Sequence, residues 1–445
     1  MKASTLRPFK ELQPYQTFSK TEIVSAVDSQ NNHLRERVRP LKLSIITQFF
    51  PPDFAATGQL IEELVRHLEQ QNMNIKVFSG QPGYAFSDAV APRYEQSGNT
   101  QIVRSRTTNL WGKRLRGKTL SGILFTIRAF IHLVRNCRRR ELALITTAPP
   151  FLPIIGYLVN VLFGMSYVCL LYDLYPDIAI ELGVVANQNW IARAWKAVNR
   201  SVWMRSQSII VLSPNMKQKI IELCPEVADK IHVIHSWADP NKISPIDKVD
   251  NWFAHKHGLV DTFTVLYSGN MGRCHDIDTI FNAAVELKDE PICFVCIGGG
   301  AKRKELQQKI KQQGLNNFLF LPYQDKAELK YSLTACDLSL VSVSPGMESL
   351  VAPSKLYSAL ASSRPVAAIC PSQTYLKDLL EGSGCGVWFE NGDSQRLADF
   401  IKRLRRDPEK ASAMGNSARS SLEANYTPSV IAQQYADVLR RYSAA

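Results

Sequence analysis

Short apolar runs alternate with helical patterns twice along this chain, and this repeat constrains the fold more than any other feature. The apolar runs of the first half lie at 41–47, 75–78, 101–103, 142–146, 167–171, 208–212 and 232–234. Those of the second half lie at 262–267, 292–297, 318–321, 338–341, 365–368 and 386–389, with helical patterns at 277–287 and 302–313 between them. Strands that are covered on both faces read as uniformly apolar. The chain therefore predicts an α/β fold with two doubly wound parallel sheets.

The chain has 445 residues, which is too long for one hydrophobic core. We expect residues 41–240 to form a first Rossmann-like domain and residues 241–428 to form a second. Residues 1–40 are polar and mixed in charge, so we expect a loosely ordered extension rather than a secretory signal. The last segment, 429–445, is expected to be a helix that packs back onto the first domain. Ligands bind at the carboxyl ends of such strands, so a cleft between the two domains is expected.

Residues 142–172 carry no charged side chain and are long enough to cross a bilayer. Pro149, Pro150 and Pro153 interrupt the stretch, however, and Gly164 begins a turn. This pattern favours a strand, a buried helix and a second strand. A membrane-spanning helix is the alternative.

The net charge of +13 comes mostly from one segment, because residues 101–140 contain eleven Lys or Arg and no Asp or Glu. Apolar residues such as Trp111 and Ile127 alternate with these cations and make the segment amphipathic. Such a segment is typical of a protein that binds an anionic membrane surface. A solvated helix face is the alternative. Nucleic acid is not expected, because the chain has none of the common nucleic-acid-binding motifs.

The nine cysteines are odd in number and scattered along the chain, which argues against a disulfide framework. Cys293 and Cys296 lie within one apolar run and have no second pair nearby, so we interpret them as buried strand residues. The sequence thus predicts a cytoplasmic protein.

The segment 348–366 combines a loop, a helix start and a cation. Pro353 and Ser354 suit the first positions of a helix, and Arg364 followed by proline ends it. Lys355 then falls in the first turn, where the helix dipole is positive. A lysine at that position is explained by a bound anion, for which a diphosphate is the natural candidate.

Four segments in this order resemble a known class of enzyme. They are Gln48-Phe49-Phe50-Pro51-Pro52 leading to Gly58, Leu171-Tyr172-Asp173-Leu174-Tyr175-Pro176-Asp177, Ser268-Gly269-Asn270 and Pro353-Ser354-Lys355-Leu356. From about Leu41 to its end, the chain resembles family 4 glycosyltransferases with the GT-B fold. Within that family it is similar to the branch that builds bacterial exopolysaccharides such as colanic acid.

The resemblance implies a retaining transfer of a sugar from a UDP- or GDP-sugar to a lipid-linked or polysaccharide precursor. It places the donor in the second domain and the acceptor in the first. No cofactor and no metal are expected beyond the nucleotide sugar itself. Together with the basic segment, it implies a peripheral protein on the inner face of the plasma membrane.

The resemblance also assigns roles to individual residues of the second domain. Arg273 and Lys355 would neutralise the leaving diphosphate, the interaction that usually dominates such catalysis. The other expected donor contacts are Gly269, Asn270, Gly299, Tyr323, Gln324, Ser354 and Ser358. An ordinary surface arginine and tight-turn glycines are the alternative readings for Arg273 and Gly299.

The expected pair of glutamates is incomplete in this chain. Ser358 occupies the position of the second glutamate and Leu350 that of the first. Glu348 becomes the candidate for the sugar contact, with a solvated loop glutamate as the alternative. In the first domain, Gly58 would let its loop lie beneath the transferred sugar. Asp173 follows a central strand and is the candidate base for the acceptor hydroxyl, with a helix cap as the alternative.

Asp276 and Asp278 match a D-x-D pattern, but they fall at a helix start, where carboxylates favour the dipole. We therefore expect no metal there. Two other functions remain open on the sequence: a sugar-nucleotide 2-epimerase of the same fold, and an inactive basic protein that binds membranes or nucleic acid.

Overall fold

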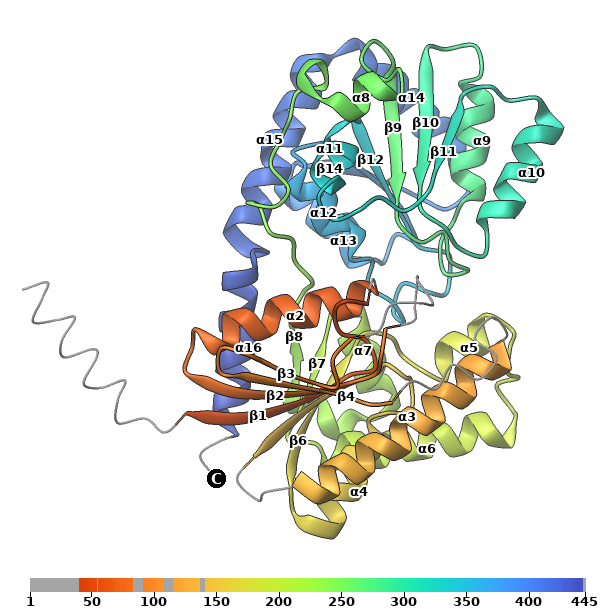
Figure 1. The fold of residues 1–445 in the computed structure, drawn as a ribbon. Coiled ribbons are helices and arrows are strands. Elements are labelled where there is room, and N and C mark those ends of the chain that lie inside the picture. Colours follow the sequence, from red (N-terminus) through yellow and green to blue (C-terminus); the bar gives the residue numbers. More distant parts are fainter. Residues whose placement is uncertain (1–39, 54, 83–90, 107–114, 137–140, 443–445) are drawn as a thin grey trace, which may run out of the picture. The chain divides into compact units, whose positions relative to one another are not determined.

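A computed structural model describes residues 40–53, 55–82, 91–106, 115–136 and 141–442 (Figure 1). The first sheet has eight strands in the order β3-β4-β2-β1-β5-β6-β7-β8. Their bounds are β1 Leu41–Ile46, β2 Met73–Ser79, β3 Tyr94–Ser97, β4 Thr100–Arg104, β5 Leu142–Thr146, β6 Ser166–Leu171, β7 Ser208–Val211 and β8 Ile231–Val233. Every pairing is parallel except that of β3 with β4. The helices are α2 Ala56–Glu69, α3 Leu115–Asn136, α4 Ile154–Phe163, α5 Asp177–Glu181, α6 Trp190–Arg205 and α7 Pro214–Leu223.

The second sheet has six parallel strands in the order β11-β10-β9-β12-β13-β14. The strands are β9 Phe263–Ser268, β10 Ile292–Ile297, β11 Phe318–Leu321, β12 Leu338–Ser342, β13 Val366–Ile369 and β14 Gly386–Phe389. The helices around it are α8 Trp252–Lys256, α9 Asp278–Glu286, α10 Arg303–Gln313, α11 Leu329–Thr334, α12 Lys355–Ala361, α13 Tyr375–Ser383, α14 Ser394–Arg406 and α15 Pro408–Asn425. The strand order reverses between β9 and β12, and in the first sheet between β1 and β5. Two doubly wound sheets are therefore confirmed, and the reversal points mark where ligands bind.

The apolar stretch 142–172 folds as β5, α4 and β6, which confirms the prediction of a strand, a helix and a strand. The helix is less buried than expected. Ile155, Gly156 and Val159 face the core, but Leu162 is 60% exposed. None of the helices in the described ranges combines the length and the apolar character that a bilayer crossing demands.

The eight cysteines in the described part of the chain are free, and Cys293 and Cys296 both lie on β10. Burial raises the pKa of the Cys296 thiol to about 12, so it stays protonated and unreactive. The interpretation as buried strand cysteines is confirmed for Cys296, whereas Cys293 lies on the same strand but is only partly buried.

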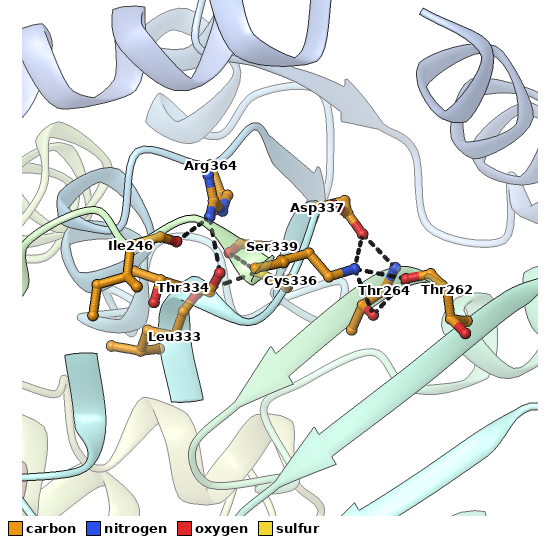
Figure 2. A network of polar contacts seen from close by, with 10 residues as sticks. Ile246, Thr262, Thr264, Leu333, Thr334, Cys336, Asp337, Ser339 and Arg364 are labelled. Carbon is orange, nitrogen blue, oxygen red and sulfur yellow. Dashed lines mark hydrogen bonds and ion pairs between the residues drawn. The ribbon is translucent and has the colours of Figure 1, made fainter. Parts of the chain in front are cut away.

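Residues 246–250 of the connection between the two sheets are fastened to the second one by a polar network (Figure 2). Lys248 Nζ donates to Asp337 Oδ2 at 2.7 Å and to the carbonyl oxygen of Thr262 at 2.6 Å. The same carboxylate oxygen accepts the backbone N–H of Thr264 at 2.7 Å. Arg364 donates to the carbonyl oxygen of Ile246 at 2.8 Å. The network lies at the amino ends of β9 and β12, away from the ligand-binding edge, so its role is structural.

The chain after β14 forms three helices, because Asp407 caps α15 and Thr427 caps α16 (Pro428–Arg441). α16 packs against α2 of the first domain. Tyr435 of α16 is buried edge-on against Trp237, and Arg440 donates to the carbonyl oxygen of Gln71 at 2.7 Å. The last helix thus returns to the first sheet, as the GT-B architecture requires.

Candidate functional site

Three loops meet at the carboxyl edge of the second sheet: one after β9, one after β10 and one between β12 and α12. The first two are joined by backbone hydrogen bonds. Gly269 N–H donates to the Ile297 carbonyl at 2.8 Å, and Met271 N–H donates to the Gly299 carbonyl at 2.6 Å. Because parallel strands end at the same edge, residues that follow different strands are brought together here.

Glycine is required in these loops for steric reasons. Gly269 and Gly298 have φ angles of +124° and +122°, which L side chains rarely adopt. A Cβ on Gly298 would also lie 2.3 Å from the carbonyl oxygen of Gly269. The two loops therefore pack backbone on backbone, a surface to which a flat or charged ligand can come close.

Lys355 lies in the first turn of α12 and reaches back to the loop after β9. Its Nζ donates to the Tyr267 hydroxyl at 2.5 Å, contacts the Asn270 carbonyl oxygen at 3.4 Å, and lies 4.0 Å from the centre of the Tyr267 ring. Among the described residues, no Asp or Glu forms an ion pair with it. Burial lowers the pKa of Lys355 to about 7, so a bound anion would restore its charge.

Two cationic or titratable side chains at this edge were not predicted. Lys302 Nζ donates to the His275 carbonyl at 2.6 Å, and His275 Nδ1 donates to the Ser342 carbonyl at 2.7 Å. Burial, and then the charge of Lys355, lowers the pKa of His275 to about 3, so the ring is neutral at physiological pH. Lys302 follows Gly300, and a lysine after a glycine loop is the signal that could have identified it.

The structure places the remaining predicted donor residues around this edge. Arg273 follows the β9 loop and is exposed, and no bond joins its side chain to another described residue. Ser354 has helical backbone angles, as expected for a first position of the helix, and its side chain makes no capping hydrogen bond. Its hydroxyl is not used by the helix. Ser358 lies one turn further along α12, partly buried.

Tyr323 follows β11 and its ring lies against the glycine loop. A Cβ on Gly299 would be 3.2 Å from Tyr323 Cε2, and the tyrosine side chain is 55% exposed. Gln324 folds back on its own turn, where Nε2 donates to the Pro322 carbonyl at 2.8 Å. The exposed aromatic face beside open backbone suits the stacking of a nucleobase.

Glu348 lies in the loop between β12 and α12. Its Oε2 is buried and accepts no hydrogen bond from the residues that the structure describes. A buried acceptor without a donor is costly to leave unpaired. Glu348 is therefore suited to accept a ligand hydroxyl.

Asp173 connects the first domain to this loop, because it forms an isolated antiparallel bridge with Val351. The next residue, Leu174, donates its N–H to the Leu350 carbonyl at 3.1 Å. Burial raises the pKa of Asp173 to about 6. Asp173 of the first domain is thus paired with the segment of the second domain that leads to Lys355.

Gly58 lies in the first turn of α2 and not in the loop where it was expected. A Cβ at this position would be 3.0 Å from the Phe49 carbonyl carbon. The glycine thus lets α2 pack closely on the 48–52 segment of its own domain. A contact of Gly58 with a sugar stays a prediction.

The D-x-D pattern has a structural role. Asp276 Oδ1 accepts the Thr279 N–H at 3.0 Å, and its Oδ2 accepts the Asn391 amide at 2.8 Å. Asp278 pairs with Lys309 on α10. Across the described ranges, no three His, Cys, Asp or Glu residues gather as metal ligands would.

Two family models match the chain, one for each sheet. The model described as "Glycosyltransferase Family 4" matches residues 57–242, and the model described as "Glycosyl transferases group 1" matches residues 250–421. Together they cover both domains in the order of the GT-B architecture.

Two relatives align over nearly their full length. A probable glycosyltransferase of Pseudomonas aeruginosa, WbjE, is 21% identical over 90% of this chain and 98% of its own. A putative colanic acid biosynthesis glycosyl transferase of Escherichia coli K12, WcaI, is 24% identical over 86% of this chain and 97% of its own. Among solved structures, HepE of Anabaena, in complex with UDP and glucose, superposes with a TM-score of 0.67 at 16% identity, over 90% of this chain and all of that one.

Proposed function

Since the chain is a glycosyltransferase with the GT-B fold, we propose that it transfers a sugar, with retention, from a UDP- or GDP-sugar to a precursor in exopolysaccharide or cell-envelope glycan synthesis. The observation that carries the proposal is Lys355, a half-buried lysine that has no acidic partner among the described residues and whose ammonium group lies against the loop after β9. HepE, which shares the fold, is bound to UDP and glucose. A diphosphate at the same edge would supply the missing negative charge.

The diphosphate would lie between Lys355 and Arg273, over the backbone of Gly269 and Asn270. When the bond to the sugar breaks, negative charge grows on the diphosphate oxygens, and fixed cations stabilise this charge without reorganisation. Lys302 adds a third positive charge nearby. These cations do the work that a metal ion does in other transferases, so we propose that none is needed.

The nucleoside and the sugar would occupy opposite ends of this site. Tyr323 would stack on the base, with Gln324 and the backbone of Gly299 beside it, while Ser354 and Ser358 would bind oxygens of the nucleotide. Glu348 would accept a hydroxyl of the transferred sugar through its unpaired Oε2. These roles follow from chemical complementarity.

Asp173 would act on the acceptor. With a pKa of about 6 the side chain is ionised at neutral pH, yet it is a stronger base than an ordinary aspartate. It reaches the donor loop through its bridge with Val351. We propose that it accepts the proton of the attacking hydroxyl, or orients the acceptor.

The acceptor is proposed to be lipid-linked or a growing polysaccharide, at the cytoplasmic face of an anionic membrane. The amphipathic helix α3 supports this location, because Ile123, Ile127 and Ile131 are exposed while Arg128 and Arg135 lie among them. The basic run 138–140 and Trp111 fall outside the described residues.

Calorimetry with a panel of nucleotide diphosphates tests the donor site. We expect UDP or GDP to bind, and Lys355→Ala to weaken binding by about tenfold or more. Lys309→Ala is the matched control, because this partly exposed lysine of α10 pairs, among the described residues, with Asp278 and Glu305 alone. Equal binding by wild type and Lys355→Ala would contradict the diphosphate assignment. A product formed from the nucleotide sugar without any acceptor would indicate a 2-epimerase instead.

A further inference from the structure

Exposed apolar side chains gather on three helices of the first domain. Of the seventeen large apolar side chains that are exposed in the described part of the chain, twelve lie on α3, α4 and α6, four on each. They are Leu120, Ile123, Ile127 and Ile131; Leu158, Val161, Leu162 and Phe163; and Trp190, Ile191, Val198 and Met204. Single exposed apolar residues are normal, but a concentration of this kind marks an interaction surface.

The three helices are neighbours, because α4 contacts both α3 and α6 (Figure 1). Each already buries another face in its own domain: Phe125 and Leu133 of α3, Ile155 and Val159 of α4, and Val202 and Trp203 of α6. The exposed side chains are thus a second apolar face, which we call the α3–α4–α6 face. The core of the domain does not need it.

The charge of this face has one sign. The sequences of the three helices contain no Asp or Glu. Arg135 and Arg193 are exposed and their side chains make no bond with another described residue. Among the described residues, the acids that form ion pairs with α6 are Asp177, which binds Lys196, and Glu226, which binds Arg200. The unpaired charge of the face is therefore positive, which complements an anionic lipid surface.

An apolar pocket of about 210 Å³ lies between α4 and α6. Phe151, Ile154, Trp195 and Val198 line it, together with Asn199, whose amide already donates to the Tyr175 carbonyl at 2.6 Å. A sugar would find almost no polar partner in this pocket, whereas a lipid chain needs none. Trp195 also stacks on Tyr175, with ring centroids 6.1 Å apart, and Tyr175 follows Asp173 by two residues.

We propose that the α3–α4–α6 face docks onto an anionic bilayer, with the α4–α6 pocket toward the lipid. This inference rests on the proposed function, because a lipid-linked acceptor would then approach Asp173 directly from the membrane. The proposal adds α4 and α6 to the membrane contact of the basic helix α3. The apolar stretch 142–172, which contains α4, would then touch the bilayer without crossing it. Apolar burial and cation attraction act together at such a surface.

Vesicle sedimentation tests the proposal with two lipid compositions, pure phosphatidylcholine and a mixture with phosphatidylglycerol. We expect the wild-type chain to bind the anionic vesicles roughly tenfold or more tighter than the pure phosphatidylcholine vesicles, and to bind them less tightly at high salt. The double variant Leu162→Gln/Trp190→Gln should lose roughly tenfold or more of this binding, because both side chains are largely exposed, 60% and 76%. Arg193→Gln should weaken binding only to the anionic vesicles.

Val249→Gln is the matched control, since this valine is 65% exposed but lies outside the face. Its binding should equal that of the wild type. Circular dichroism checks that the variants are folded, and UDP calorimetry on the same samples should be unchanged. A wild type that binds UDP but no vesicle would overturn the docking proposal alone, as would a dimer that the double variant dissociates. Vesicle binding without nucleotide binding would overturn the proposed donor site instead.

Discussion

The surroundings of Lys355 disfavour the charged form of its side chain as long as no anion is bound. Burial lowers its pKa to about 7, and a diphosphate would raise it again. Binding above pH 7 must then be accompanied by proton uptake. We expect the dissociation constant of UDP to rise by up to about tenfold per pH unit from pH 7 upward, until the pKa of the complex is reached.

Calorimetry at pH 8, in buffers with different ionisation enthalpies, measures this proton uptake directly. Lys355→Arg is the control, because a guanidinium stays charged over the whole range. This variant should bind UDP with little dependence on pH between 7 and 9. A wild-type affinity that is constant over the same range would show that Lys355 does not contact the nucleotide.

At Asp173 we expect a trade-off between stability and activity: the carboxylate is needed for sugar transfer but destabilises the fold. Its pKa in the folded protein, about 6, lies above the ordinary value of 3.8. The folded state therefore disfavours the carboxylate, and this loss of stability is absent below about pH 4 and complete above pH 6. We expect Asp173→Asn to abolish sugar transfer while raising the free energy of unfolding at pH 8 by about 1 kcal/mol.

Urea unfolding at pH 5 and pH 8 checks this prediction, and the gain should be smaller at pH 5. Asp177→Asn is the control, because it removes a carboxylate that pairs with Lys196 at 3.3 Å. That variant should gain no stability at pH 8. Full transfer activity in Asp173→Asn would exclude the proposed role of the carboxylate.

At the level of single residues, the sequence indicated Lys355, because a segment that carries the family resemblance coincides with a predicted helix start at this position. It indicated the glycines because they directly follow predicted strands. It carried no signal for His275, and for Lys302 only its position after a glycine loop. Their position depends on the pairing of Met271 with Gly299, a contact between two loops. The left-handed backbone of these loops cannot be read from residue types alone.

Among the elements, the strands covered on both faces were the most predictable. Leu142–Thr146 and Ile292–Ile297 begin and end where their apolar runs do, and so does Phe318–Leu321, an edge strand whose residues are only partly buried. β3 was missed because all four of its residues are exposed, so no apolar pattern marks it. The pairing of β3 with β4 is stabilised by the buried Arg104 of β4, whose guanidinium binds Glu95 of β3 at 2.8 Å.

The network that fastens the connecting segment permits a prediction at this scale. Asp337 accepts hydrogen bonds from Lys248 Nζ and from the Thr264 N–H (Figure 2). Asp337→Ala would leave an ammonium group and a backbone donor without their partner. We expect a loss of about 2–3 kcal/mol in the free energy of unfolding, measured by urea titration.

Glu423→Ala is the matched control for this loss. Its carboxylate is half exposed and pairs with Arg419 one helical turn away. Exposed pairs of this kind contribute about 0.5 kcal/mol or less. A similar loss in both variants would contradict a special role for the Asp337 network.

For the whole molecule, the alternation of strands and helices was enough to predict two sheets and their winding. The contact between the first sheet and the donor loop was not predictable, because Asp173 and Val351 are distant in sequence and their bridge is a backbone pairing. The resemblance predicted the order of the two domains along the chain, whereas the residues that join them are seen only in the structure.

Gly346 offers the sharpest test of this contact between the domains. Its φ angle is +80°, and a Cβ there would lie 2.2 Å from Oε1 of Glu181 in the first domain. Gly314 has a similar φ of +64°, but a Cβ there would meet nothing within 4 Å. Both alanine variants suffer the same backbone strain, of about 1 kcal/mol.

Only Gly346→Ala must also displace Glu181, so we expect it to lose up to about 1 kcal/mol more than Gly314→Ala in urea unfolding. It should also slow sugar transfer, because the loop that moves carries Glu348 and leads to Lys355. Combining Glu181→Ala with Gly346→Ala should recover the stability that Gly346→Ala loses beyond Gly314→Ala, since the side chain that collides is then absent. If the double variant is no more stable and no more active than Gly346→Ala alone, the contact between Glu181 and Gly346 does not align the two domains.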